Sequence, residues 1–270
     1  MPDTPVRAIV FDVGHTLWFM ARSLDWTHIL PQQGARLRPL VASWGITLDE
    51  PVEQVQREIW DAVEEAYRAE EERGTRRDPS VPFLIRGALA VRGVDVTEAQ
   101  AEAWFRAAYL SVSEFGWQLY PDTLDVLREL HGRGLRIGVA TNRPFPAEMF
   151  RESLAEYGMA PYIDVVVCSA DAGHFKQHPA VFELVLRELG SAPGETVMVG
   201  DDAEADMRGG KAAGMRTVWK LNGRYELPPC RYADYTIHDL GELLSLPLFS
   251  SGRPAAESLT PHDDANADRY

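Results

Sequence analysis

Six short apolar runs constrain the fold of this 270-residue chain more than any other feature. They are nearly continuous and mostly rich in Val and Ile, and they lie at Val6–Phe11, Leu135–Ala140, Ile163–Cys168, Thr196–Val199, Met215–Trp219 and Tyr235–Ile237. Strands that are buried on both faces of a parallel sheet show this pattern. Helical periodicity fills the later gaps, at Pro121–His131, Phe145–Tyr157, Ala180–Leu189 and Ala203–Ala213. Strands that alternate with helices predict an α/β fold with a doubly wound parallel sheet.

The long interval after the first run has only helical signals, from about residue 18 to residue 116. One apolar stripe recurs every three or four residues, at Val52, Val55, Ile59, Val63 and Tyr67. Thr97 and Gln100 resemble a capping box before a second apolar stretch, and Pro79 and Pro82 separate the two segments. We therefore predict a helical cap at 18–116, inserted after the first strand, and a core at 1–17 and 117–246. Residues 247–270 are rich in Ser, Pro, Ala and Asp and predict a flexible C-terminal tail.

Composition narrows the classes of function. The net charge of −14 argues against general nucleic-acid binding, which needs a basic face. No apolar run of about eighteen residues predicts a membrane span, and the N-terminus lacks the pattern of a signal peptide. Cys168 ends an apolar run and is expected to be a buried thiol rather than half of a disulfide. We expect a cytoplasmic protein that binds neither membranes nor nucleic acids.

Polar residues follow several of the predicted strands, where open parallel sheets bind their ligands. Asp12 to Thr16 follow the first run, Thr141 to Arg143 follow the second, and Gly200 to Asp202 follow the fourth, with Asp206 four residues on. Lys176 lies in the loop after the third run. Carboxylates, a hydroxyl and a lysine therefore meet at one edge of the sheet. This pattern indicates a metal-assisted reaction on an anionic ligand.

These segments resemble the four motifs of the haloacid dehalogenase (HAD)-like hydrolase superfamily, in the family's order. The first motif resembles Phe11 to Leu17, the second is Thr141-Asn142, the third centres on Lys176, and the fourth is Gly200 to Asp206. Each motif alone is a weak signal, but four in order at the right strand ends form a strong one. The helical insert matches the cap that many members place after the first motif. The resemblance implies a capped hydrolase of the phosphatase type.

The resemblance also implies roles for individual residues. Asp12 would attack phosphorus and form an aspartyl-phosphate. Thr141 and Lys176 would complete the catalytic set, and Asn142, His15 and Thr16 would contact the substrate. Mg2+ would be held by Asp12, Asp201 and the main-chain carbonyl of Gly14. Asp202 and Asp206 would not bind the metal directly but would hydrogen-bond to groups around it, with Asp206 holding Lys176 or a metal-bound water.

Gly14 is a departure from the family pattern. Phosphatases of this family usually carry a second aspartate there, which protonates the leaving group and then activates water. Loss of a general acid/base typically costs ~10²–10⁴-fold in rate. His15, a cap histidine such as His28, or solvent with an acidic leaving group are the candidate substitutes.

Three functions therefore stay open. The main prediction is a Mg2+-dependent phosphomonoesterase that acts on a small phosphorylated metabolite. The first alternative is a catalytically weak or inactive relative that binds a phosphorylated ligand or a partner. The second alternative is a 2-haloacid dehalogenase, because dehalogenases of the family also lack the second aspartate. The sequence specifies neither the substrate nor the oligomeric state.

Several residues have a structural explanation as an alternative to a role in the site. Asp202 is expected to cap the helix that begins at Ala203. Arg143 is expected at the surface, within reach of a substrate anion. The aromatic residues Trp60, Trp104 and Phe105 are expected in the cap core rather than in a ligand site. Trp18 and Phe19, at the exit from core to cap, are candidates to line the pocket.

Overall fold

Six parallel strands form the central sheet, and each coincides with one of the predicted apolar runs. The structure is a computed structural model that describes residues 4–20, 25–223 and 228–249. The strands are β1 (Ala8–Phe11), β4 (Arg136–Thr141), β5 (Val165–Cys168), β6 (Thr196–Gly200), β7 (Arg216–Lys220) and β8 (Tyr235–Ile237). They lie in the order β5-β4-β1-β6-β7-β8, all parallel. The predicted α/β fold with a doubly wound parallel sheet is confirmed.

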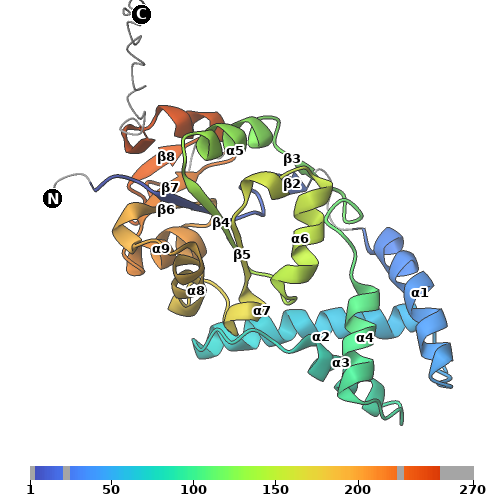
Figure 1. Ribbon diagram of the computed structural model, residues 1–270. Helices are drawn as coiled ribbons and strands as arrows, with labels where there is room; N and C mark the ends of the chain where they lie inside the picture. Colours follow the sequence, from blue (N-terminus) through green and yellow to red (C-terminus); the bar gives the residue numbers. More distant parts are fainter. Residues whose placement is uncertain (1–3, 21–24, 224–227, 250–270) are drawn as a thin grey trace, which may run out of the picture.

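Helices cover both faces of this sheet (Figure 1). Ile9 and Phe11 of β1 pack in one cluster with α5 (Thr123–Gly132) and α6 (Ala147–Glu156). The alternate residues of the same strand, Ala8 and Val10, pack in a second cluster with α8 (Pro179–Leu189). All four β1 side chains are fully buried, which explains why the run is apolar at every position. The shorter helical segments are α7 (Ser169–Ala172), α9 (Gly209–Ala212), η1 (Ala160–Tyr162), η2 (Pro193–Glu195), η3 (Ala203–Arg208) and η4 (Leu240–Ser245).

Four helices make up the part of the chain that we predicted to be a cap: α1 (Trp26–Ser43), α2 (Val52–Arg73), α3 (Val81–Ala90) and α4 (Glu98–Ala108). They gather at one side of the core in Figure 1. The capping box of α4 is confirmed, because the Thr97 hydroxyl accepts from the Gln100 N–H and the Gln100 side chain accepts from the Thr97 N–H. Pro79 and Pro82 lie between α2 and α4, as predicted, but Pro82 is in the first turn of α3, a helix that the sequence did not predict. The missing N–H costs no helical hydrogen bond there.

A short antiparallel sheet lies at the boundary between core and cap. It pairs β2 (Trp18–Met20) with β3 (Trp117–Leu119). The expectation that residues 18 to 116 hold helical structure only is therefore wrong at the start of that interval. Strands of three residues are too short for a period of two to be recognised in the sequence.

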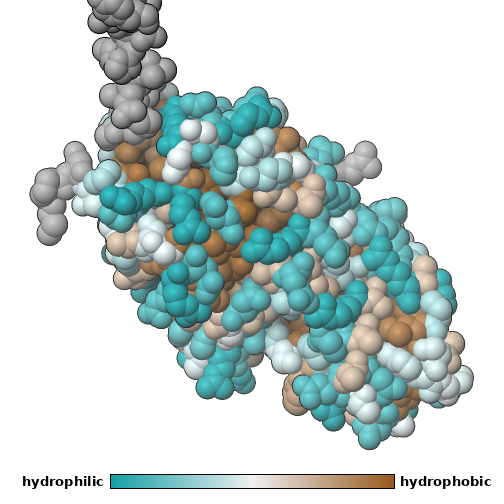
Figure 2. Space-filling model, viewed as in Figure 1, coloured by the Kyte–Doolittle hydropathy of each residue, from teal (hydrophilic) through white to brown (hydrophobic). Residues whose placement is uncertain are grey.

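The predicted tail at 247–270 also needs correction at its start. Pro247–Phe249 form a 3₁₀ turn, η5, and the side chains of Leu248 and Phe249 are buried against the core. Residues 250–270 lie outside the described part of the chain. Figure 2 shows hydrophilic residues over most of the visible face, with apolar residues gathered over the core. Among the described residues, no helix combines the length and the apolar character needed to cross a membrane.

Candidate active site

Three predicted site residues meet at the carboxyl edge of the sheet. β1 lies between β4 and β6, so the residues at the ends of these strands are neighbours although they are far apart in sequence. Asp12, Thr141 and Asp201 therefore line one cavity of about 170 Å³. The Asp12 N–H donates to Val199 O at 2.8 Å, which extends the β1–β6 pairing up to the carboxylate and fixes its place.

Lys176 is the centre of the polar network at this edge. Its Nζ donates to Asp12 Oδ1 at 2.6 Å, to Asp206 Oδ1 at 2.6 Å and to Ala140 O at 3.0 Å. All three donors of the ammonium group are thereby used. The other oxygen of Asp12, Oδ2, accepts from the Thr16 hydroxyl at 3.2 Å. The Asp12 carboxylate is thus held from two sides while it still borders the cavity.

Burial and neighbouring charges have opposite effects on the pKa values of the groups in this network. Burial by itself disfavours the Lys176 ammonium, but the negative charges of Asp12 and Asp206 outweigh it and raise the pKa of Lys176. Burial also raises the pKa of the Asp206 carboxyl, and the positive charge of Lys176 opposes that change. Lys176 is therefore a fixed cation, suited to neutralising negative charge on a ligand beside Asp12.

The segment after β6 brings Asp206 close to the strand. A Cβ at Gly200 would lie 2.3 Å from Asp206 Oδ2, so this close approach requires glycine. Asp206 Oδ2 accepts from the Asp202 N–H at 3.1 Å, and the Asp202 side chain accepts from the N–H groups of Glu204 and Ala205. Asp202 is the N-cap of η3, as expected, and the residue also lines the cavity.

Three carboxylates at this edge could hold a divalent cation. Oxygen atoms of Asp12, Asp201 and Asp206 all lie within 4.8 Å of one another. Carboxylate oxygens are the ligands that Mg2+ prefers, and it commonly takes only one or two of them besides other oxygens. Both oxygens of Asp206 already accept hydrogen bonds, from Lys176 and from the Asp202 N–H. Both oxygens of Asp12 accept hydrogen bonds as well, so bonding alone does not rank the three carboxylates. Asp206 is the more deeply buried, at 1% exposed against 8% for Asp12, and Asp201 and Gly14 line the same cavity.

Of the three residues that we expected to contact a substrate, only Asn142 lines the 170 Å³ cavity. Thr16 is fully buried, and its hydroxyl donates to Asp12. Asn142 borders the cavity, but its side-chain oxygen accepts from the Lys176 N–H at 2.8 Å. His15 is exposed and packs on Trp117, with ring centroids 5.3 Å apart. Thr16 and Asn142 thus position the groups that face the ligand.

Neither His15 nor His28, the two histidines considered as substitutes for the usual second aspartate, lines the 170 Å³ cavity. Of the residues that the structure describes, no histidine lines the 170 Å³ cavity, and His28 is exposed on α1. The space at Gly14 is open, because a Cβ there would meet only Trp117 Cη2, at 3.8 Å. The backbone at Gly14 therefore accommodates a side chain that the sequence lacks.

Arg143 is not the surface residue that we expected. Its Nε is buried and has no hydrogen-bond partner among the described residues. The guanidinium lies 5.7 Å from the centroid of the Trp117 ring and 5.8 Å from that of Phe150. Burial lowers the pKa of Arg143, and the negative charge of Asp12 opposes that change. The available sequence signal was its place two residues after Thr141, at the end of a central strand.

A second cavity, of about 270 Å³, lies between cap and core. Trp60, Trp104 and Phe105 line it, so these cap residues have a role at a cavity surface besides their place in the cap core. Trp18 and Phe19 line neither this cavity nor the 170 Å³ cavity, and the prediction that they would is wrong. Trp18 is fully buried against Phe150, while the Phe19 ring packs on Tyr120.

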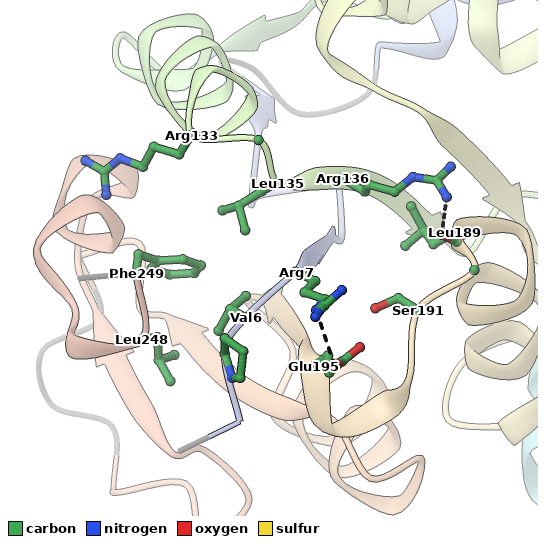
Figure 3. Close-up of a pocket in the computed structure, with 13 residues that line it drawn as sticks. Val6, Arg7, Arg133, Leu135, Arg136, Leu189, Ser191, Glu195, Leu248 and Phe249 are labelled. Carbon is green, nitrogen blue, oxygen red and sulfur yellow. Dashed lines mark hydrogen bonds and ion pairs between the residues drawn. The ribbon is translucent and has the colours of Figure 1, made fainter. Parts of the chain in front are cut away.

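A larger cavity of about 410 Å³ lies at the opposite edge of the sheet, where β1, β4 and β6 begin (Figure 3). Its arginines are engaged within the protein. Arg7 pairs with Glu195 at 3.4 Å, and Arg136 donates to the Leu189 carbonyl. Arg133 donates to Glu129 at 2.9 Å. This cavity is therefore neither at the ligand-binding edge of the sheet nor equipped with unengaged cations.

A family model described as a haloacid dehalogenase-like hydrolase matches residues 6–214. Among curated proteins, the chain is similar to a glyceraldehyde 3-phosphate phosphatase of Methanocaldococcus jannaschii, with 37% identity over 47% of this chain and 55% of the relative. It is also similar to a phosphoserine phosphatase of Thermus thermophilus, with 34% identity over 53% of this chain and 54% of the relative. The chain thus spans about half the length of these relatives.

Solved structures show the same resemblance. A HAD phosphatase from Thermococcus onnurineus is 27% identical, with a TM-score of 0.51, and the match covers 89% of this chain and 97% of that one. A 2-haloacid dehalogenase from Pseudomonas syringae pv. tomato DC3000 is 26% identical, with a TM-score of 0.61 and the same coverage. The similarity to solved structures extends over both core and cap.

Proposed function

The chain belongs to the haloacid dehalogenase-like hydrolases, and from this we propose that it is a Mg2+-dependent phosphomonoesterase acting on a small phosphorylated metabolite. The curated relatives named as phosphatases support phosphoryl chemistry. The observation that carries the proposal is the Lys176 ammonium, which bonds both Asp12 and Asp206 at 2.6 Å beside a carboxylate cluster.

Asp12 is the nucleophile in this proposal. One of its carboxylate oxygens attacks phosphorus, the bond from phosphorus to the ester oxygen breaks, and an aspartyl-phosphate forms. Water then attacks the same phosphorus, the bond to Asp12 breaks, and inorganic phosphate leaves. The hydrogen bonds from Lys176 and Thr16 hold the carboxylate so that attack needs little rearrangement.

An acidic protein repels an anionic substrate unless cations at the site offset its negative charge. In this proposal, Lys176 and Mg2+ are those cations. Lys176 neutralises charge on the transferring group, and Asp206 keeps the ammonium in place through its own bond. Thr141 borders the cavity and is positioned to donate to a phosphoryl oxygen. When bound by Asp12, Asp201 and the Gly14 carbonyl, Mg2+ would stabilise negative charge on the phosphoryl oxygens.

Gly14 affects both steps of the reaction that need a proton transfer. With no carboxyl group at this position, the leaving oxygen and the attacking water depend on solvent for proton transfer. We therefore expect modest turnover and a preference for leaving groups that need little protonation.

The test is the substitution Asp12→Asn, assayed in Mg2+ with a chromogenic phosphomonoester. We expect a loss of at least ~10⁴-fold, because the amide is a poor nucleophile. Asp95→Asn, at an exposed position outside both cavities, is the matched control and keeps full activity. Circular dichroism verifies the fold of both variants. Equal activity in Asp12→Asn and wild type would overturn the proposed function.

Dehalogenation is the second candidate, because the chain is similar to a solved 2-haloacid dehalogenase and carries glycine at position 14. The clustered carboxylates of Asp12, Asp201 and Asp206 favour the phosphatase, since carbon–halogen cleavage needs no such cation site. Halide release from a 2-haloacid in the presence of a chelator would establish dehalogenation. Its absence would remove this candidate.

A further inference from the structure

The 270 Å³ cavity between cap and core has mostly aromatic and aliphatic walls. Cap residues from α2, α3 and α4 form most of it, including Trp60, Ile85 and Phe105. The core closes it with Trp117 of β3 and with Phe145, from the loop after β4. The cavity thus lies between the two parts of the molecule, next to the edge where the catalytic groups lie.

Several polar atoms in these walls are already engaged. The Trp104 indole N–H donates to Gln56 Oε1 at 2.7 Å, and the Trp60 indole N–H donates to Gln33 Oε1 at 3.3 Å. The Tyr67 hydroxyl donates to Asp78 Oδ2 at 3.1 Å. A ligand rich in hydroxyl groups would lose its water here and find few new partners, which is costly. Glu64 of α2 also lines the cavity, at an exposed position, and the other cap walls favour an apolar ligand.

Arg143 connects this cavity with the catalytic one. Of the described residues, it alone lines both the 270 Å³ and the 170 Å³ cavity. Trp117 lies beside it, 5.7 Å from its guanidinium, and also 3.8 Å from the Cβ position of Gly14. The two cavities therefore adjoin at Arg143, and Trp117, which lines the larger one, also borders the space at Gly14.

We infer that the substrate is a phosphate monoester of an apolar, ring-containing alcohol, with its ring in the 270 Å³ cavity and its phosphoryl group beside Asp12 and Arg143. This inference rests on the proposed function. The volume fits, because an apolar cavity of about 150 Å³ is enough to hold benzene. A cavity of 270 Å³ has room for a phenylalkyl or a fused two-ring group. Arg143, which lines both cavities, would donate to a phosphoryl oxygen from its guanidinium group.

Binding of two phosphonates tests the ligand class without any turnover. The probes are 3-phenylpropylphosphonate and propylphosphonate, which carry carbon in place of the ester oxygen and cannot be hydrolysed. Titration calorimetry of the wild-type protein in Mg2+ gives the ratio of their Kd values. We expect the phenyl compound to bind about 30-fold more tightly, because its ring leaves water for apolar walls. A ratio near one overturns the inference.

Two tryptophan variants test where the ring binds. Trp60→Ala removes part of the cavity wall, and we expect the Kd ratio to fall about tenfold. Trp44→Ala is the matched control, since Trp44 also packs on the cap core but does not line the cavity, and it should leave the ratio unchanged. A full ratio in Trp60→Ala would overturn the assignment to this cavity. The wild-type ratio decides the ligand class even if Trp60→Ala does not fold.

Hydrolysis of 2-phenylethyl phosphate and ethyl phosphate separates this inference from the proposed function. These esters have similar leaving groups, so a difference in kcat/KM reports on the ring. Asp12-dependent turnover of both esters without preference would leave the proposed function standing and overturn the inference. Tight binding of the phenyl phosphonate without turnover of either ester or of the chromogenic phosphomonoester would support the ligand class and overturn the proposed function.

Discussion

The two cavities near the carboxyl edge of the sheet differ in their lining: one is mainly polar and charged, and the other is mainly apolar. The catalytic cavity is lined by Asp12, Lys176 and Asp201, and it is held by hydrogen bonds between groups far apart in sequence. The cap cavity is lined mainly by aromatic and aliphatic side chains such as Trp104 and Phe105. In the proposed function, the first would stabilise charge at phosphorus, and the second would recognise the rest of the substrate.

This difference predicts that substitutions in the two cavities have different effects. Changes in the catalytic cavity should alter the rate for every substrate by a similar factor, because every phosphomonoester presents the same phosphoryl group. Changes in the cap cavity should alter the preference among substrates. Arg143, which lines both, is where the two effects would combine.

After Asp12→Asn, the largest effect is expected for Lys176→Met. The ammonium bonds both Asp12 and Asp206, and its loss leaves two buried carboxylates without a counter-charge. We expect kcat/KM to fall about 10³-fold for 2-phenylethyl phosphate and ethyl phosphate alike. Breaking this buried pair should also cost about 3–5 kcal/mol of stability, so activity is measured where circular dichroism shows a folded variant.

Lys211→Met is the matched control for that experiment. Lys211 is a partly exposed lysine of α9 that pairs with Asp234 at the surface, so its loss should change neither activity nor stability by much. If Lys176→Met altered the preference between the two esters rather than the rate for both, the proposed division between the cavities would be wrong.

A smaller effect, in the opposite direction, is expected for Gly14→Asp. The position has room for a side chain, with Trp117 Cη2 at 3.8 Å from the added Cβ. The new carboxyl group would supply the missing general acid/base, and we expect kcat to rise at least ~10-fold for both esters. Gly14→Asn adds the same bulk without an acid and should give no gain. A rise with asparagine as well would show that proton transfer is not the cause.

The smallest effect concerns the junction of cap and core. The Asp78 N–H donates to Gly173 O, and its carboxylate accepts from Tyr67 on α2. Burial raises the pKa of Asp78 from 3.8 to about 6. The folded protein therefore binds this proton more tightly than the unfolded chain does. Stability is reduced above pH 6 and recovers as the pH falls through 6 toward 4.

Asp78→Asn removes that buried charge. At pH 7.5 we expect the variant to be more stable by about 1–2 kcal/mol, after allowance for partial exposure, and the gain should vanish near pH 4. Thermal melts of both proteins across this pH range measure the difference, and a Tm rise of about 2–6 °C at pH 7.5 corresponds to it. A gain that does not change with pH would show that titration of Asp78 is not responsible.

Much of the core could be predicted from the sequence. Runs such as Val6–Phe11 are apolar at every position because both faces of a parallel strand are buried, and that signal is local. The cap was predicted less completely: α1 and α3 were not identified, and β2 and β3 are too short to show a period. The candidate site followed from strand ends, because the carboxyl ends of parallel strands share one edge.

The sequence by itself determined the α/β class and the set of polar residues near Asp12, because hydrophobic periodicity and strand-end positions are properties of short segments. Only the tertiary structure decided what those residues touch. It placed Thr16 behind Asp12, turned the Asn142 oxygen toward the Lys176 backbone, and buried Arg143 between two cavities. It also made one aromatic cavity from separate helices and a core loop. Such contacts join residues far apart in sequence, so no local pattern records them.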